Sequence, residues 1–217
     1  MPKLRVHNYA TSIDGYAAGP NQGLETPMGE GAGGLHAWVF ASPYGQEKIL
    51  GKDPGDAPRV GVDQRFLEAG DEGIGATIMG RNMFGPVRGE WGDSDWTGWW
   101  GPEPPYHHPV FVLTHHAHDP IETVGTTFHF VTDGIEAALE QAFAAADGAD
   151  VRVGGGASTV QQYLAAGLVD EMHVALSPVL LGAGERLFDH LDGATAGYEV
   201  VAVTPGEGAT HVQIAKA

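Results

Sequence analysis

Short apolar segments recur along the chain, and they follow two different periodicities. Brief runs rich in Val, Ile and aromatic residues are typical of strands, whereas longer segments with apolar residues every three or four positions are typical of helices. The strands expected from this pattern are residues 3–11, 76–80, 109–114, 127–131, 151–153, 172–177, 198–203 and 210–215. The expected helices are residues 35–41, 43–50, 62–69, 133 to about 146, and 158–166.

Strands alternate with helices over most of the chain. This order predicts an α/β fold of three layers, with a mostly parallel central sheet and helices on both faces. The last two strands are joined by T-P-G-E-G and predict a C-terminal antiparallel hairpin. Because the pattern shows neither a repeat nor a linker, residues 1–217 are expected to form one domain. Ser42-Pro43 predicts a helix start, and Asp133 with Glu136 predicts a capping box.

The composition narrows the classes of partner. There are no cysteines, which excludes disulfides, thiolate zinc sites and a cysteine nucleophile. No apolar run approaches the roughly 20 residues that span a bilayer, and the first residues carry no apolar signal segment, so we expect a cytoplasmic protein without a membrane partner. The 11 Lys and Arg against 28 Asp and Glu give a net charge of −17, which argues against nucleic acid. The expected partner is a small molecule.

A glycine-rich turn is the clearest candidate binding feature. The apolar run 151–153 meets three glycines, Gly154, Gly155 and Gly156, and Ser158-Thr159 then opens a helical stretch. Glycines let the backbone approach a ligand closely, and the free N–H groups of a helix start favour a phosphate. We therefore predict a phosphate-binding turn, with an ordinary strand–helix turn as the alternative.

Four segments of the chain also carry a recognisable pattern. They are S-I-D-G at 12–15, M-G-R at 79–81, V-F-V-L-T at 110–114, and the stretch 154–188 with its G-G, L-V-D-E and P-V-L-L-G-A-G-E-R-L-F motifs. Together they resemble the dihydrofolate reductase-like family, and most closely the reductase domain of the bifunctional riboflavin-biosynthesis protein. The resemblance covers nearly the whole chain, and its last stretch is the most specific.

This resemblance implies NADPH as cofactor and hydride transfer to a pterin-like or ribosylaminopyrimidine-like substrate. It implies that Arg81 and Thr114 lie near the 2′-phosphate and adenosine half of the cofactor and that Gly80 also binds the cofactor. It implies that residues 20–34 form a lid and that Ala10 and Ala17 offer backbone groups to the nicotinamide amide. The residues implied to surround the pyrophosphate are Gly155, Gly156, Ala157, Ser158 and Thr159.

Two positions depart from the family pattern. The folate enzymes carry an acid two residues before an Ala-Trp pair, where this chain has Leu35, so reduction of dihydrofolate itself is not expected. A hydroxyl residue usually follows the M-G-R arginine by two positions, but here Met83 stands there and removes one phosphate donor. The preference for NADPH over NADH is therefore left open.

A reductase also needs a route for a proton, and two residues are candidates for catalysis. Asp14 follows the end of a strand, where ligands meet α/β sheets, although an aspartate there can instead hold an Asx-turn. His36 begins a helix, and an imidazole suits proton exchange near neutral pH, although it can also be structural. Glu25 and Glu30 are more simply solvated loop charges.

Histidines and tryptophans supply two further hypotheses. His107-His108 and the histidines at 115, 116 and 118 flank one predicted strand that spans about 20 Å, so the two groups cannot share an ion. His116 and His118 could still join a distant carboxylate, but loop polarity or cofactor contacts are the preferred interpretation, and no functional metal site is expected. The tryptophan-rich segment 90–101 either stacks a flat heterocycle or packs its rings over the core or a subunit contact.

These observations predict an NADPH-dependent reductase of a small heterocyclic substrate, related to riboflavin-biosynthesis enzymes. A non-catalytic nucleotide- or small-molecule-binding protein of the same fold is the alternative, because the acid is absent at Leu35. A histidine-based metalloprotein is a third hypothesis. A symmetric homodimer is also expected, since open sheet edges need covering.

Overall fold

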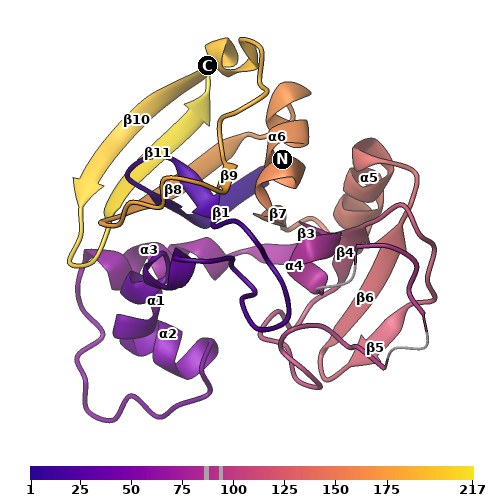
Figure 1. Ribbon diagram of the computed structural model, residues 1–217, viewed down its shortest axis with the longest axis horizontal. Coiled ribbons are helices and arrows are strands. Elements are labelled where there is room, and N and C mark those ends of the chain that lie inside the picture. Colours follow the sequence, from indigo (N-terminus) through magenta and orange to yellow (C-terminus); the bar gives the residue numbers. More distant parts are fainter. Residues whose placement is uncertain (86–87, 93–94) are drawn as a thin grey trace. The chain divides into compact units, whose positions relative to one another are not determined.

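The computed structural model describes residues 1–85, 88–92 and 95–217 (Figure 1). Within these residues nine strands form one sheet, in the order β10-β11-β8-β1-β7-β3-β4-β6-β5. A second, two-stranded sheet pairs β2 with β9. The strands are β1 (Leu4–Ser12), β2 (Tyr16–Ala18), β3 (Ile74–Gly80), β4 (Val110–Leu113), β5 (Ile121–Thr123), β6 (Thr126–Val131), β7 (Asp150–Gly155), β8 (Glu171–Ser177), β9 (Glu185–Arg186), β10 (Tyr198–Pro205) and β11 (Thr210–Lys216).

The direction of strand pairing confirms the predicted fold class. The consecutive pairs β1–β7, β7–β3, β3–β4 and β4–β6 are all parallel. The pairs β5–β6, β11–β8 and β10–β11 are antiparallel, and the last of these is the predicted C-terminal hairpin. The fold is therefore α/β with a mostly parallel centre.

Helices connect these strands. They are α1 (Ala37–Ala41), α2 (Pro43–Lys48), α3 (Val62–Asp71), α4 (Arg81–Phe84), α5 (Ile135–Ala145) and α6 (Ala157–Ala165), with 3-10 turns η1 (Ala32–Gly34) and η2 (Ala194–Gly197). No helix in the described part of the chain combines the length and the apolar composition that crossing a membrane requires.

One predicted helix start is right and one is wrong. The Ser42 hydroxyl accepts a hydrogen bond from the Gly45 N–H at 2.9 Å, and Pro43 begins α2, as expected for an N-cap followed by proline. The capping box at Asp133 does not form, because Gly134 is the N-cap of α5 and no side chain caps that helix. Gly134 has φ 91°, a conformation that glycine adopts without a steric penalty, and Asp133 therefore stays outside the helix.

The contacts divide the chain into two compact units. Unit 1 comprises residues 1–6 and 73–170, and unit 2 comprises residues 7–72 and 171–217. In unit 1, β3 is almost continuously buried, as is typical of a parallel strand with both faces covered. A core cluster of unit 1 contains Met79, Phe84, Val110, Val112 and Phe128. A core cluster of unit 2 contains Trp38, Val39, Leu67, Ala175 and Ala209.

Candidate functional site

The predicted glycine turn joins β7 to α6 in unit 1. Gly155 has φ 132°, which strongly favours glycine, and the peptide bond between Gly155 and Gly156 is cis. The Gly156 carbonyl accepts hydrogen bonds from the N–H groups of Thr159 at 3.1 Å and Val160 at 3.2 Å, so the helix starts here. The two earlier N–H groups of the helix, those of Ala157 and Ser158, have no preceding helical carbonyl to accept them. The turn therefore presents donors at the positive end of a nine-residue helix, where a phosphate would be stabilised.

Gly80, at the end of β3, lies against this turn. A Cβ atom on Gly80 would collide with the Thr159 hydroxyl and would lie 3.7 Å from the Gly155 carbonyl oxygen. Thr159 is itself buried. The structure thus brings together three residues that the sequence assigned to cofactor binding, and it explains why the first of them is glycine.

We expect Gly80→Ala to destabilise the protein by about 1–3 kcal/mol, because the added methyl group would overpack this contact. Urea denaturation of the variant measures the change in the free energy of unfolding. Gly197→Ala is the matched control, since a Cβ there would meet no atom within 4 Å. Equal losses in the two variants would show that the Gly80 contact is not responsible.

Arg81 follows Gly80 and lies beside Thr114. Its Nη1 donates to the Thr114 hydroxyl at 3.2 Å, and its guanidinium carbon lies 3.0 Å from the centre of the Trp91 ring. The buried Nε and Nη2 atoms of Arg81 have no hydrogen-bond partner among the residues that the structure describes. Burial lowers the Arg81 pKa, yet a guanidinium stays protonated at neutral pH. A charged group with two open donors is thereby held in place.

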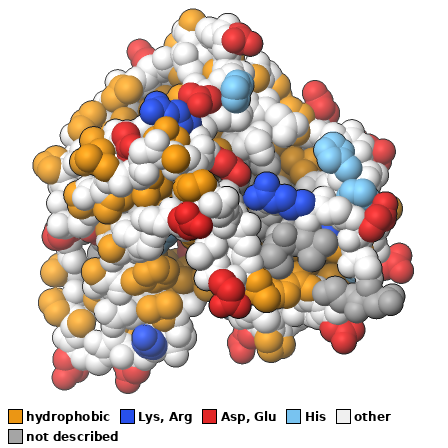
Figure 2. Space-filling view, in the orientation of Figure 1, with side chains coloured by type: hydrophobic (Ala, Val, Ile, Leu, Met, Phe, Trp, Pro, Cys, Tyr) orange, Lys and Arg blue, Asp and Glu red, His pale blue; other side chains and the backbone are white. Residues whose placement is uncertain are grey.

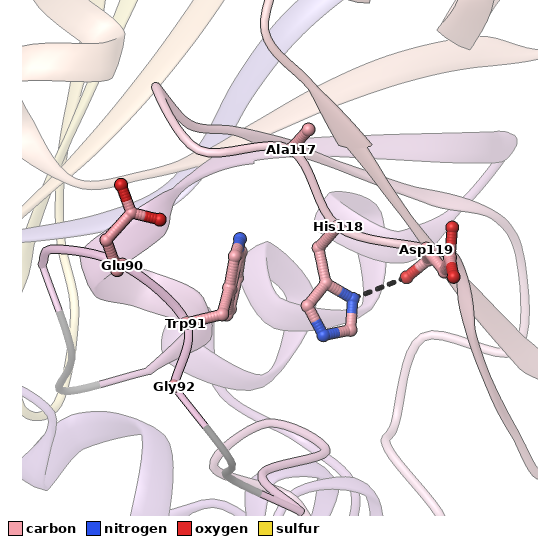
Figure 3. Close-up of a pocket in the computed structure, with 6 residues that line it drawn as sticks. All are labelled: Glu90, Trp91, Gly92, Ala117, His118 and Asp119. Carbon is pink, nitrogen blue, oxygen red and sulfur yellow. Dashed lines mark hydrogen bonds between the residues drawn. The ribbon is translucent and has the colours of Figure 1, made fainter.

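An open pocket borders this arginine's aromatic neighbour (Figure 3). Its lining residues are Glu90, Trp91, Gly92, Ala117, His118 and Asp119. Figure 3 shows the Trp91 and His118 rings next to each other, and their centroids are 4.6 Å apart. The Trp91 indole N–H donates to the His116 carbonyl at 2.8 Å, and His116 pairs with Glu90 at 3.1 Å. These contacts fix an aromatic wall in unit 1.

The tryptophan-rich segment 90–101 mostly packs its rings against unit 1. Trp91 contacts Phe84 and Phe130, and the Trp96 indole N–H donates to the Phe84 carbonyl at 2.9 Å. This packing is what the alternative to ligand stacking predicted. Residues 93 and 94 of the segment lie outside the described residues.

In unit 2, Asp14 joins two of the motifs. Its carboxylate accepts hydrogen bonds from the N–H groups of Leu181 at 3.1 Å and Gly182 at 2.7 Å. The pKa of Asp14 falls to about 2, chiefly through a hydrogen bond with the Ser12 side chain. Desolvation opposes this shift, and the backbone donors of Gly182 and Leu181 add to it. Asp14 is therefore a carboxylate at neutral pH, and it ties the S-I-D-G turn to the P-V-L-L-G stretch.

The other candidates of unit 2 are His36, Ala10, Ala17 and the predicted lid at residues 20–34. His36 is half-buried at the start of α1, and burial lowers its pKa, so its imidazole is neutral at pH 7. Ala10 is buried and packs in a cluster with Ala32 and Leu35, and Ala17 is buried in β2. The base of the predicted lid is closed by the hydrogen bonds Gly19 N–H to Met28 O and Glu30 N–H to Pro20 O, each at 2.8 Å.

The structure therefore sorts the predicted site residues by unit. Those of unit 1 are Gly80, Arg81, Thr114, Gly155, Gly156, Ala157, Ser158 and Thr159. Those of unit 2 are Ala10, Asp14, Ala17 and His36. The contact of Arg81 with Trp91 could not be predicted, because Trp91 lies in a segment without periodicity, which gives no clue to its contacts.

Within residues 1–85, 88–92 and 95–217, no group of three or more His, Asp or Glu side chains is arranged to hold a metal. His108 is instead hydrogen-bonded to the Thr77 hydroxyl at 2.7 Å. Figure 2 shows acidic side chains spread over the face in view, with fewer basic ones among them.

Solved structures share this fold. A putative riboflavin biosynthesis protein from Shewanella sp. PV-4 has a TM-score of 0.61 and 22% identity, over 100% of this chain and 99% of that one. A pyrimidine reductase-like protein from Corynebacterium diphtheriae has a TM-score of 0.54 and 14% identity, over 100% and 92%. The diaminohydroxyphosphoribosylaminopyrimidine deaminase/5-amino-6-(5-phosphoribosylamino)uracil reductase of Thermotoga maritima has a TM-score of 0.55 and 13% identity, over 100% and 57%.

A search by sequence among curated proteins finds no significant match. The profile of one protein family, described as the RibD C-terminal domain, matches residues 2–204, nearly the whole chain. This match confirms the resemblance carried by the four motifs, and the chain belongs to the RibD C-terminal domain family.

Proposed function

We propose that this protein is an NADPH-dependent reductase that transfers a hydride to a small heterocyclic substrate, with ribosylaminopyrimidines as the first class to test. Membership of the RibD C-terminal domain family supports an oxidoreductase. The observation that carries the cofactor assignment is the Arg81 guanidinium, which is held by Thr114 and Trp91 with two buried donors open.

The residues of unit 1 fit a dinucleotide that carries an additional phosphate. The open Nε and Nη2 donors of Arg81 form one edge of the guanidinium, which matches two phosphate oxygens. The turn at Gly155 and the start of α6 supply backbone donors for a pyrophosphate. Gly80 packs closely against Thr159, the third residue of α6, because it has no Cβ that would collide with the Thr159 hydroxyl.

When bound, NADPH would supply a hydride from its nicotinamide ring, and the protein's own contribution would be positioning and proton supply. The ionised Asp14 has no proton to give at neutral pH, so its proposed role is to hold the P-V-L-L-G stretch. The neutral His36 imidazole carries one N–H, and we assign proton supply to it or to water. A positioned donor of this kind contributes roughly 10²–10⁴-fold to a rate.

One observation favours the non-catalytic alternative. Leu35, which stands where folate enzymes carry an acid, is fully buried in the apolar cluster with Ala10 and Ala32. No carboxylate from this position can serve a substrate. A binding protein of the same fold would retain the Arg81 and Gly155 features and would bind NADPH without consuming it.

Oxidation of NADPH in the presence of 5-amino-6-(5-phosphoribosylamino)uracil separates the two functions. The reductase proposal predicts oxidation that depends on this compound and none with dihydrofolate. NADPH binding without oxidation, across a panel of ribosylaminopyrimidines and pterins, would overturn the reductase and support the binding protein.

A further inference from the structure

A line of hydrogen-bonded polar groups lies buried in unit 2, and none of them belongs to the candidate site. The line runs from the backbone N–H of Asn8 in β1 through His173 in β8 and His211 in β11 to Asp63 at the start of α3; we call it the histidine chain. The successive distances are 3.1 Å from Asn8 N to His173 Nδ1, 2.9 Å from His173 Nε2 to His211 Nδ1, and 2.7 Å from His211 Nε2 to Asp63 Oδ1. Both histidines have no exposed surface.

The backbone fixes the direction of every hydrogen bond in this chain. The Asn8 N–H can only donate, so His173 Nδ1 carries no proton and the neutral His173 ring is protonated at Nε2. That N–H donates to His211 Nδ1, which leaves His211 protonated at Nε2 as well. The Nε2–H of His211 donates to one carboxylate oxygen of Asp63, and the other oxygen accepts from the Gly208 N–H at 2.7 Å. With two neutral rings and one carboxylate, every hydrogen bond of the histidine chain therefore has one donor and one acceptor.

Aromatic rings enclose the two histidines. The Phe66 ring stacks on both, with centroid distances of 4.4 Å to His173 and 4.2 Å to His211, and Trp38 meets both edge-on. A Cβ on Gly206 would collide with Asp63 and with His211, so the backbone also packs closely here. On these sides the histidine chain is therefore covered by uncharged rings, which carry no charge to neutralise an added proton.

Ionisable groups of neighbouring elements also lie close to the histidine chain. Besides its own Asp63, the titratable neighbour from β1 is His7, whose ring centroid lies 5.7 Å from that of His173. From the β10–β11 turn, the Glu207 carboxylate accepts the N–H groups of Val62 and Asp63 at 3.0 Å and so caps α3, with Arg65 of α3 as its cationic neighbour. β8 and α1 contribute His173 and the uncharged Trp38.

An additional proton has no place in this arrangement. At His173 Nδ1 it would oppose the Asn8 N–H, and at His211 Nδ1 it would oppose the N–H of His173. Either position sets two donors against each other and breaks a buried hydrogen bond. We propose that the histidine chain is an acid-sensitive latch, which holds α3, β11, β8 and the Asn8 portion of β1 together while both rings are neutral and releases them when a proton enters.

The electrostatics of His173 agree with this geometry. Burial chiefly, together with the charges that His7 and His211 can carry, lowers its pKa from about 6.5 to about 3. Because the folded-state pKa lies below the unfolded value, the unfolded state binds the proton more readily between these two values. Stability is therefore lost as the pH falls from about 6.5 towards about 3.

His173→Gln tests the latch, because a Gln side chain can accept from Asn8 and donate to His211 without taking up a proton. For each proton taken up on unfolding, the equilibrium constant of unfolding rises about tenfold for every unit by which the pH falls. Urea denaturation at several mildly acidic pH values measures this rise in the unfolding constant. For each unit by which the pH falls, we expect the rise in His173→Gln to be about tenfold smaller than in the unchanged protein. His115→Gln removes an exposed histidine of unit 1 and is expected to leave the pH dependence unchanged. An unaltered pH dependence in His173→Gln would overturn the proposal.

A second measurement needs no variant and decides the matter if His173→Gln does not fold. Nitrogen NMR of the histidine-labelled protein at neutral pH reports which ring nitrogens carry protons. The latch requires His173 and His211 both to be neutral and protonated at Nε2. A ring that is doubly protonated, or protonated at Nδ1, would contradict it.

Discussion

Replacing Arg81 with Ala is expected to weaken NADPH binding by about 10- to 100-fold, because hydrogen bonds to charged groups contribute about 1.5–3 kcal/mol. The same substitution is expected to change NADH binding by no more than about twofold, since NADH has no 2′-phosphate to meet the open Nε and Nη2 donors. Calorimetric titration of both nucleotides into the variant and the unchanged protein measures the two effects.

Lys52→Ala is the matched control for this substitution. It removes one positive charge from an exposed side chain of unit 2, in a protein whose net charge is −17. A loss of NADPH affinity similar to that of Arg81→Ala would show that the total charge, rather than a local contact, sets the affinity. Equal losses of affinity for NADPH and NADH in Arg81→Ala would show that Arg81 does not bind the 2′-phosphate.

Trp38→Ala is expected to lower the free energy of unfolding by about 3–5 kcal/mol, the range for a buried aromatic residue. The Trp38 ring is 2% exposed and packs with Val39, Leu67, Ala175 and Ala209. It also contacts His173 and His211, at centroid distances of 6.4 Å and 5.3 Å. Urea denaturation at neutral pH, where the histidine chain is intact, measures the loss.

Phe40→Ala in the same short helix is the control for Trp38→Ala. Phe40 is 40% exposed, so its removal is expected to cost less than about 1 kcal/mol. If both substitutions destabilised the protein equally, the loss would come from the helix rather than from the packing of the buried indole.

Much of the fold follows from the apolar pattern, because buried parallel strands leave a clear signal. The predicted strand at 76–80 is β3 (Ile74–Gly80), and the predicted helix at 62–69 is α3 (Val62–Asp71). The glycine turn could also be predicted from the apolar run that meets three glycines. In the structure β7 ends at Gly155 and α6 begins two residues later. In each case a run of apolar residues ends at a residue with distinctive backbone preferences.

Contacts between distant and individually ordinary residues could not be predicted. β2 and β9 are three and two residues long, and each is too short to show a periodicity. The histidine chain joins residues separated by 38 and 148 positions, and each lies in an unremarkable strand or helix. The stacking of Arg81 on Trp91 depends on a segment without any repeating pattern.

Calorimetric titration of the unchanged protein with NADPH, with NADH measured in parallel, tests directly whether this protein binds the proposed cofactor. We expect micromolar binding of NADPH and weaker binding of NADH, because only NADPH carries the 2′-phosphate that the open donors of Arg81 can bind. Absence of binding by both nucleotides would contradict the cofactor assignment and the proposed reductase with it.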